Sequence, residues 1–252
     1  MGRAIGRVEI SADPLALAHH VAEWMTQAAL AARGPFRVSL SGGSTPKTLY
    51  GLLASDEFRG RFPWPRVSWY WGDERFVPHY HPDSNYRMAR EAILIKAQVS
   101  PENIHAIPTD GTPEDAARRY ERTLQAAYGA VTLDPRRPLF DVTLLGLGPD
   151  GHTASLLPGD PVLNERRRWV AAVSHGRPEV RITMTYPAIE SSRRVAFLVA
   201  GEEKAEIFSR IRAGNSQVPA ARVQPVGELF WFVDRAAAGE ETGAASHGAR
   251  AR

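Results

Sequence analysis

The sequence contains no cysteine among its 252 residues, which excludes disulfide bonds, thiolate nucleophiles and cysteine-based zinc or iron–sulfur sites. The longest apolar runs, such as residues 195–200, are far too short to span a bilayer. The first seven residues lack the apolar segment of a secretory signal. We therefore expect a cytoplasmic protein without a membrane partner.

An excess of charge of one sign is also lacking, because 31 basic and 28 acidic residues leave a formal net charge of +3. The basic residues are scattered rather than gathered into a stripe with interleaved aromatic residues, which argues against a nucleic-acid partner. Only Lys47, Lys96 and Lys204 are lysines. A lysine beside a motif is therefore more informative here than in most proteins.

The length and the 43% hydrophobic content are sufficient for one full core, and no repeat or composition break indicates a linker. We expect a single domain over residues 1–235. Residues 236–252 are poor in large apolar side chains, so we expect a disordered C-terminal tail there.

Short apolar segments alternate along the chain with segments of helical periodicity. A helix is expected after the Asp13–Pro14 pair, because aspartate caps helices and proline favours their first turn. Strands are expected at residues 36–41, 67–71, 140–147, 169–173, 181–185, 195–200 and 229–233. Further helices are expected from residue 44, through 88–94, over 112–129 and over 202–212. This alternation predicts an α/β fold, with an open, mostly parallel sheet and helices on both faces, of Rossmann-like type.

Residues 41–47 (SGGSTPK) join an expected strand to an expected helix. Gly42 and Gly43 let backbone amides approach an anion, and the N-terminus of the helix adds a favourable dipole. The spacing fits neither a Walker A loop nor a dinucleotide fingerprint. We interpret the segment as a phosphate-binding loop, to which Ser44 and Thr45 add hydroxyl groups. A glycine turn before a well-capped helix is the alternative.

Two further segments follow expected strands and have charged side chains. In residues 72–75 (GDER), the Arg75 guanidinium can grip a phosphate or a carboxylate while Asp73 holds it in place. A surface ion pair is the alternative. In residues 201–204 (GEEK), Lys204 is either a second counter-charge for a phosphate or an exposed helix residue.

The most informative segment is residues 144–158 (LLGLGPDGHTASLLP), in which an apolar run ends in a Gly/Pro turn. Ligands of open parallel sheets bind beyond the carboxyl ends of the strands. The titratable pair Asp150 and His152 is therefore a candidate active site. A solvated turn with an incidental histidine is the alternative.

The sequence lacks the residues that a metal site or a serine-hydrolase site would need. His79, His81 and Asp83 lie in one proline-bounded loop, but they offer too few ligands in a fixed geometry, so we expect no metal site. The sequence has no Gly-x-Ser-x-Gly elbow, which leaves a serine hydrolase without its nucleophile.

Taken in order, five segments resemble the 6-phosphogluconolactonase family, namely residues 41–46, 71–78, 83–89, 145–156 and 201–205. Five motifs in the right order are more specific than any one of them. This family belongs to a sugar-phosphate-binding α/β group that also contains glucosamine-6-phosphate deaminases. The resemblance implies hydrolysis of 6-phospho-D-glucono-1,5-lactone to 6-phospho-D-gluconate in the oxidative pentose phosphate pathway, without a metal or an organic cofactor.

This reaction suits the candidate residues. Histidine changes its charge near neutral pH, so we expect His152 to act as general base on water and then as acid on the departing ring oxygen. Asp150 either fixes the imidazole tautomer or binds a sugar hydroxyl. The substrate is expected to be held by Gly42, Gly43, Ser44, Thr45, Asp73, Arg75, Lys204 and, as a weaker candidate, Arg87. The expected partner is a small sugar phosphate, and the protein is expected to be a monomer or a small homo-oligomer.

Two rival functions fit the sequence less well. The deaminases share the Gly-Gly-Ser-Thr loop and Asp-Gly-His, but they have a glutamate where this sequence has Leu157 and a tyrosine where it has Arg75. Loss of the glutamate removes a proton-handling group that ring opening would use. A non-catalytic sugar-phosphate sensor is the other alternative, and it would usually bring a DNA-binding segment for which we expect no room before the first helix.

Overall fold

The computed structural model describes residues 5–176, 178–214 and 217–240 of the chain. Its centre is a seven-stranded sheet in the order β1-β10-β9-β6-β2-β3-β5, and every pairing in it is parallel. The strands are β1 (Arg7–Ser11), β2 (Phe36–Leu40), β3 (Val67–Trp71), β5 (Ile104–His105), β6 (Val142–Gly146), β9 (Arg194–Val199) and β10 (Glu228–Asp234). The expected α/β fold with a parallel sheet is confirmed, although β1 and β5 were not expected from the sequence.

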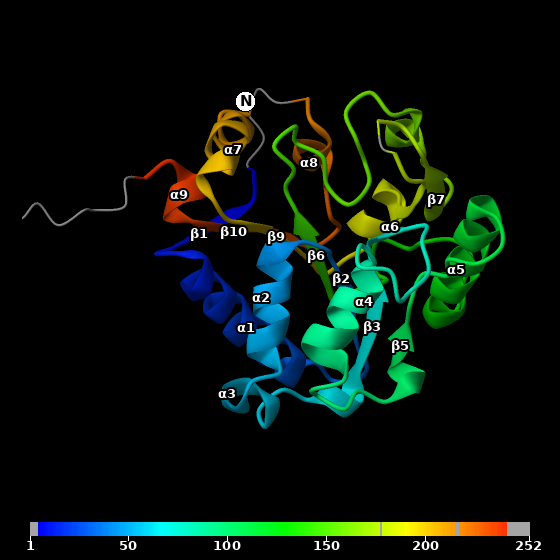
Figure 1. Cartoon of the computed structure of the whole chain (residues 1–252), viewed down its shortest axis with the longest axis horizontal. Coiled ribbons are helices and arrows are strands. Elements are labelled where there is room, and N and C mark those ends of the chain that lie inside the picture. Colours follow the sequence, from blue (N-terminus) through cyan, green and yellow to red (C-terminus); the bar gives the residue numbers. More distant parts are fainter. Residues whose placement is uncertain (1–4, 177, 215–216, 241–252) are drawn as a thin grey trace, which may run out of the picture.

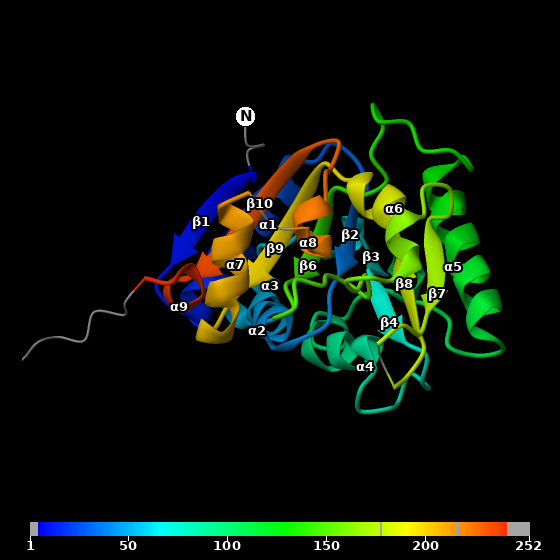
Figure 2. The ribbon, with the colours of Figure 1, turned by 90° about the horizontal axis from the view of Figure 1, so that it is seen from above.

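Helices cover both faces of this sheet (Figure 1). The helices α1 (Pro14–Ala31) and α2 (Ser44–Leu53) lie on one face, and α7 (Ala205–Arg212) and α8 (Pro219–Arg222) lie on the other (Figures 1 and 2). The other α-helices are α3 (Asp56–Arg59), α4 (Asn85–Ala89), α5 (Pro113–Tyr128), α6 (Tyr186–Glu190) and α9 (Arg235–Ala238). Short 3-10 turns occur at Trp64–Arg66, Pro101–Asn103, Pro161–Asn164 and Glu202–Lys204, and Arg90–Leu94 is π-helical.

The longer helices begin where the sequence signals indicate. The Asp13 side chain caps α1 by accepting a hydrogen bond from the amide of Ala16 (2.8 Å). The Thr112 hydroxyl caps α5 in the same way through the amide of Asp115 (3.2 Å), and Gly129 ends that helix with φ at +77°. No helix in the described ranges is long and apolar enough to cross a membrane.

A second, small sheet lies beside the first. It consists of β4 (Asp73–Arg75), β8 (Arg181–Met184) and β7 (Val170–Val173), paired antiparallel in that order, with α5 next to β7 (Figure 2). The strands expected at residues 169–173 and 181–185 are thus present, but outside the parallel sheet. The segment 174–180 is too short for the crossover that parallel strands need, so the two strands pair as a hairpin. The loop expected at residues 72–78 contains β4.

The expectation of a disordered tail from residue 236 is wrong for its first residues. Ala237 is completely buried in α9, and its amide donates to the Asp234 carboxylate (2.8 Å), which caps the helix. Alanine adds little apolar area, but it packs closely where a cap fixes the backbone, and composition alone does not reveal this. Residues 241–252 of the expected tail lie outside the described residues.

Candidate active site

A cavity of about 240 Å³ opens at the carboxyl ends of β2, β6 and β9. It lies where the strand order reverses between β6 and β2, which is the usual ligand position in an open α/β sheet. The sequence-predicted residues that line it are Gly42, Gly43, Ser44, Thr45, Asp73, Arg75, His152 and Lys204. The fold thus brings together loops from four separate parts of the chain.

The loop between β2 and α2 forms one wall of the cavity. The buried Tyr50 hydroxyl fixes the start of this loop, since it accepts from the Ser41 amide (2.9 Å) and donates to the Ser41 carbonyl (2.8 Å). Burial raises the pKa of Tyr50, so the hydroxyl keeps its proton for this contact. Gly43 has φ at +105°, a conformation that favours glycine, and Ser44 then begins α2. No described side chain caps the N-terminus of α2.

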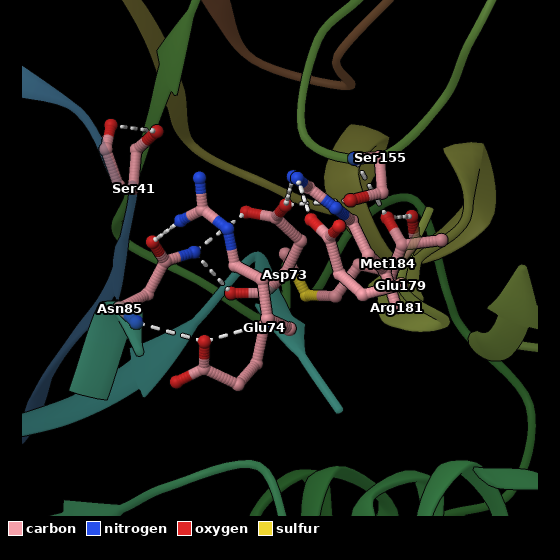
Figure 3. A network of polar contacts seen from close by, with 11 residues as sticks. Ser41, Asp73, Glu74, Asn85, Ser155, Glu179, Arg181 and Met184 are labelled. Carbon is pink, nitrogen blue, oxygen red and sulfur yellow. Dashed lines mark hydrogen bonds and ion pairs between the residues drawn. The ribbon is translucent and has the colours of Figure 1, made fainter. Parts of the chain in front are cut away.

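Strand β4 places Asp73 and Arg75 on the cavity side, with Glu74 between them. The side chain of Asp73 is 8% exposed, and its Oδ2 accepts from the Ser155 hydroxyl (2.6 Å). The guanidinium of Arg75 donates from Nη1 to Asn85 Oδ1. Figure 3 shows Asp73, Asn85 and Ser155 converging from three different segments. Residues 73–75 therefore form a largely buried network, and not the surface ion pair that was the alternative interpretation of this segment.

Glu74 points away from the cavity and anchors the start of α4. Its carboxylate accepts from the amides of Asn85 and Tyr86 (both 2.8 Å), and also from the Ser84 hydroxyl (3.0 Å) and the Arg75 amide (2.8 Å). The residue is 1% exposed. Burial raises the pKa of Glu74 above its usual range, and the four hydrogen bonds only partly oppose this shift.

The loop after β6 presents the Asp150–His152 pair. The imidazole Nδ1 of His152 lies 2.5 Å from Asp150 Oδ1, and the His152 amide donates to the same oxygen (3.1 Å). Gly151 between them has φ at +81°. A Cβ on Gly148 would lie only 2.0 Å from His152 Nδ1, so the imidazole occupies space that only glycine leaves open. The contact between the two side chains, which the sequence left undecided, is present.

Burial raises the pKa of Asp150, but the hydrogen bonds and the charge of His152 outweigh it, so the net pKa is below the usual range. Asp150 is therefore ionised at neutral pH and can accept a hydrogen bond from a protonated Nδ1 of the imidazole. The next residues continue along the cavity, where Ala154 has φ at +48°, a strained conformation for a residue with a Cβ. Ser155 then joins this loop to Asp73.

Sequence reasoning missed Arg181, which is opposite Arg75 in the β4–β8 pairing and lines the same cavity. Its Nη2 donates to Glu179 Oε1 (2.6 Å), its Nη1 lies 4.0 Å from Asp73 Oδ2, and its buried Nε has no hydrogen-bond partner among the described residues (Figure 3). Like charges directly opposite each other in a sheet are unfavourable unless an anion offsets them. Arg181 lies at the start of a strand rather than in a loop after one, so no motif indicated it.

Sequence reasoning also missed Asn85, although it lies in the recognised segment 83–89. Arg87 was selected there on the basis of charge, but it does not line the cavity, and its guanidinium contacts Glu91 (2.8 Å) and the Tyr80 carbonyl (2.9 Å). Lys204, by contrast, lines the cavity with a side chain that is 19% exposed, 3.7 Å from the Glu203 carboxylate. Its position follows the Gly201 turn, where φ is +100°.

The loop with His79, His81 and Asp83 lies outside the residues that line the cavity. The ring of His79 contacts the Ile107 carbonyl (2.8 Å), and His81 faces Asp83 at 3.6 Å. Across the described ranges, no three histidine, aspartate or glutamate side chains gather in a way that could hold a metal ion.

The chain is similar to known proteins over most of its length. The profile of the family described as glucosamine-6-phosphate isomerases/6-phosphogluconolactonase matches residues 12–231. The chain is 42% identical over 217 residues to 6-phosphogluconolactonase of Nostoc sp., covering 84% of this chain and 87% of the relative. The crystal structure of 6-phosphogluconolactonase from Thermotoga maritima superposes with a TM-score of 0.78 at 30% identity, over 90% of this chain and 99% of that one.

A monomeric glucosamine-6-phosphate deaminase has the same fold, with a TM-score of 0.78 at 20% identity over 93% of this chain and 100% of its own. This likeness concerns the fold alone. The family profile and the identity to the Nostoc relative together cover most of the chain. The chain therefore belongs to the glucosamine-6-phosphate isomerase/6-phosphogluconolactonase family.

Proposed function

We propose that this chain hydrolyses 6-phospho-D-glucono-1,5-lactone to 6-phospho-D-gluconate. The observation that carries the proposal is one cavity lined by His152 and by the cationic side chains of Arg75, Arg181 and Lys204. Asp150 is not among the lining residues, but it contacts the His152 imidazole. Such a cavity suits a substrate with a phosphate at one end and a reactive carbonyl at the other. The identity to relatives named 6-phosphogluconolactonase supports the same reaction.

In this proposal His152 is the general base. When its Nδ1–H donates to Asp150, the lone pair of the imidazole is on Nε2. Nε2 takes a proton from water while the water oxygen bonds to the lactone carbonyl carbon. The bond from that carbon to the ring oxygen then breaks, and the imidazolium returns the proton to the ring oxygen, which becomes a hydroxyl group. Asp150 holds the tautomer and stabilises the imidazolium.

In this proposal the phosphate is held by the β2–α2 loop and by the cationic side chains of the cavity. The amides and hydroxyls of Ser44 and Thr45, beside Gly42 and Gly43 at the start of α2, donate to phosphate oxygens, because this N-terminus lacks a capping side chain. Three cationic side chains complete the site, namely those of Arg75, Arg181 and Lys204. The Arg181 Nε supports this assignment, because a buried donor without a partner is costly unless a ligand accepts from it.

Asp73 has a different role from these donors in the proposal. A carboxylate in contact with a phosphate dianion would repel it, and the Asp73 side chain already accepts from Ser155 and lies near Arg181. We therefore assign Asp73 to holding Arg181 in place, which differs from the expectation that Asp73 helps to hold the substrate. Arg87 is left out, because its guanidinium is engaged by Glu91 outside the cavity.

Ammonia release from glucosamine 6-phosphate is the rival activity. Leu157 occupies the position of the deaminase glutamate, and it is an aliphatic side chain that is 6% exposed. It can neither take up nor release a proton. The proposal therefore assigns no deamination to this chain.

The test is acid release from freshly generated 6-phosphogluconolactone, with a parallel ammonia assay on glucosamine 6-phosphate. We expect acid release well above the spontaneous rate and no ammonia. Acid release at the spontaneous rate would contradict the proposal, and ammonia would favour the deaminase. Retention of 6-phosphogluconate without turnover would instead indicate a sugar-phosphate sensor.

A further inference from the structure

One buried amide connects two of the segments that line the cavity, namely β4 and the loop at Gly42. Asn85 is 3% exposed and is the first residue of α4. Its Nδ2 donates to the Asp73 carbonyl (2.9 Å) and lies 3.3 Å from Asp73 Oδ1, while its Oδ1 accepts from Arg75 Nη1. Figure 3 shows the Asn85 amide facing β4, with Asp73 beside it.

The orientation of this amide is determined by its partners. The Asp73 carbonyl can only accept, so the NH2 group of Asn85 must face it. The guanidinium of Arg75 can only donate, so the remaining oxygen must face Arg75. A reversed amide would place two donors together and two acceptors together. Asn85 therefore holds the guanidinium of Arg75 in one orientation.

The loop at Gly42 packs directly against the same amide. A Cβ on Gly42 would lie 2.1 Å from Asn85 Oδ1, so the backbone approaches the amide as closely as glycine permits. Any side chain at residue 42 would displace Asn85 or the loop. The β2–α2 loop and the Arg75 guanidinium thus share one contact point.

The backbone of Asn85 is fixed as well. Its amide donates to Glu74 Oε1 (2.8 Å), and the same oxygen accepts from the Arg75 amide (2.8 Å). Glu74 thereby joins α4 to β4 behind the cavity, and Asn85 joins them in front of it. With both ends held, the amide has little freedom to follow a misplaced guanidinium.

We infer that Asn85 is a positioning residue, which aims the Arg75 guanidinium at the phosphate of the substrate. The inference rests on the proposed function and deepens it, because it states how the Arg75 guanidinium is oriented toward the phosphate. A guanidinium binds phosphate through two parallel N–H groups, so its contribution to affinity depends on its orientation. Asn85 acts through Arg75, and its removal should have no effect once Arg75 is absent.

The test is a double-mutant cycle with Asn85→Ala, Arg75→Ala and the double variant, on two readouts. The first readout is KM and kcat for lactone hydrolysis, and the second is the dissociation constant for inorganic phosphate by calorimetry. We expect Asn85→Ala to raise both KM and the dissociation constant by roughly tenfold, the usual worth of one hydrogen bond to a charged group, with kcat nearly unchanged. In the Arg75→Ala background the same substitution should change neither value by more than about twofold.

A second variant separates positioning from a structural role. Asn85→Asp keeps an acceptor for Arg75 but adds a negative charge near the phosphate, so KM should rise further than in Asn85→Ala, and the excess should shrink as salt is added. If Asn85 only supported the fold, the new carboxylate would act on the buried Asp73 carboxylate rather than on the phosphate, and the excess would not change with salt. Asn103→Ala, which removes an exposed amide that contacts the Pro65 carbonyl, is the matched control and should leave both readouts unchanged.

Equal effects of Asn85→Ala with and without Arg75 would overturn the inference, because Asn85 would then act independently of Arg75. A fall in kcat with KM unchanged would also overturn it. If the wild-type protein binds phosphate but hydrolyses no lactone, the proposed function fails, and the cycle on phosphate affinity still decides the role of Asn85. If the wild-type protein binds no phosphate, the inference fails as well.

Discussion

The His152 imidazole contacts the Asp150 carboxylate at 2.5 Å across a single glycine, so the two side chains lie on the same side of one tight turn. The turn closes through a hydrogen bond from the Gly148 amide to the His152 carbonyl (2.9 Å). Local backbone geometry therefore brings the proposed base and its carboxylate together. The cationic side chains that line the cavity, in contrast, come from distant segments of the chain.

Replacement of Gly148 by alanine should disturb this turn. The new Cβ would lie 2.0 Å from His152 Nδ1 and 2.7 Å from Asp150 Oδ1, so the imidazole must leave its position. We expect kcat to fall by about 10²-fold or more, with a small change in KM, since base catalysis is lost while the phosphate contacts remain. Gly60→Ala, where nothing lies within 4 Å of the added Cβ, is the control. Unchanged turnover in Gly148→Ala would contradict the assigned position of the imidazole.

Arg75→Ala should act on binding instead. The phosphate loses a partner that forms charge-assisted, bidentate hydrogen bonds. KM should therefore rise roughly 10- to 100-fold, while kcat stays within about threefold. Steady-state kinetics on the lactone give both values. Arg87→Ala is the matched arginine control, because that side chain contacts Glu91 and the Tyr80 carbonyl outside the cavity. Equal effects of the two substitutions would remove Arg75 from the phosphate site.

The chain's motifs allowed the loops at the carboxyl ends of β2, β3, β6 and β9 to be recognised, because a strand followed by glycine and a polar group is a local pattern. The His152–Asp150 pair and the Gly42–Thr45 loop were therefore accessible from the sequence. Asn85 and Arg181 were not, because their importance arises from contacts between segments. Arg181 faces Arg75 only through the register of β4 with β8, which no spacing along the chain reveals.

The buried carboxyl of Glu74 should make stability depend on pH. Burial raises the pKa of Glu74 in the folded chain above its value in the unfolded chain, so between the two values the folded state binds more protons. This contribution to stability is fully present below the unfolded pKa and is lost as pH rises through the folded pKa. Glu74→Gln cannot titrate and should lack this decline.

Denaturant unfolding between about pH 4 and about pH 7 checks this expectation. The difference in unfolding free energy between Glu74→Gln and the wild type should shift in favour of the variant as pH rises. Glu102→Gln, at an exposed glutamate, is the control, and its unfolding free energy should change with pH in parallel with that of the wild type. Parallel curves for Glu74→Gln would show that the folded pKa of Glu74 is not raised.

The most direct test of the account is the rate of acid release from 6-phosphogluconolactone by His152→Ala beside the wild type and Asp150→Asn. If the imidazole is the base, kcat of His152→Ala should fall by about 10²–10⁴-fold. Asp150→Asn should lose less, because the base remains but its orientation and charge partner weaken. All three proteins should bind inorganic phosphate equally, since the cationic side chains that line the cavity are unchanged. Full turnover in His152→Ala would contradict the central claim, and the site of water activation would have to be sought elsewhere in the cavity.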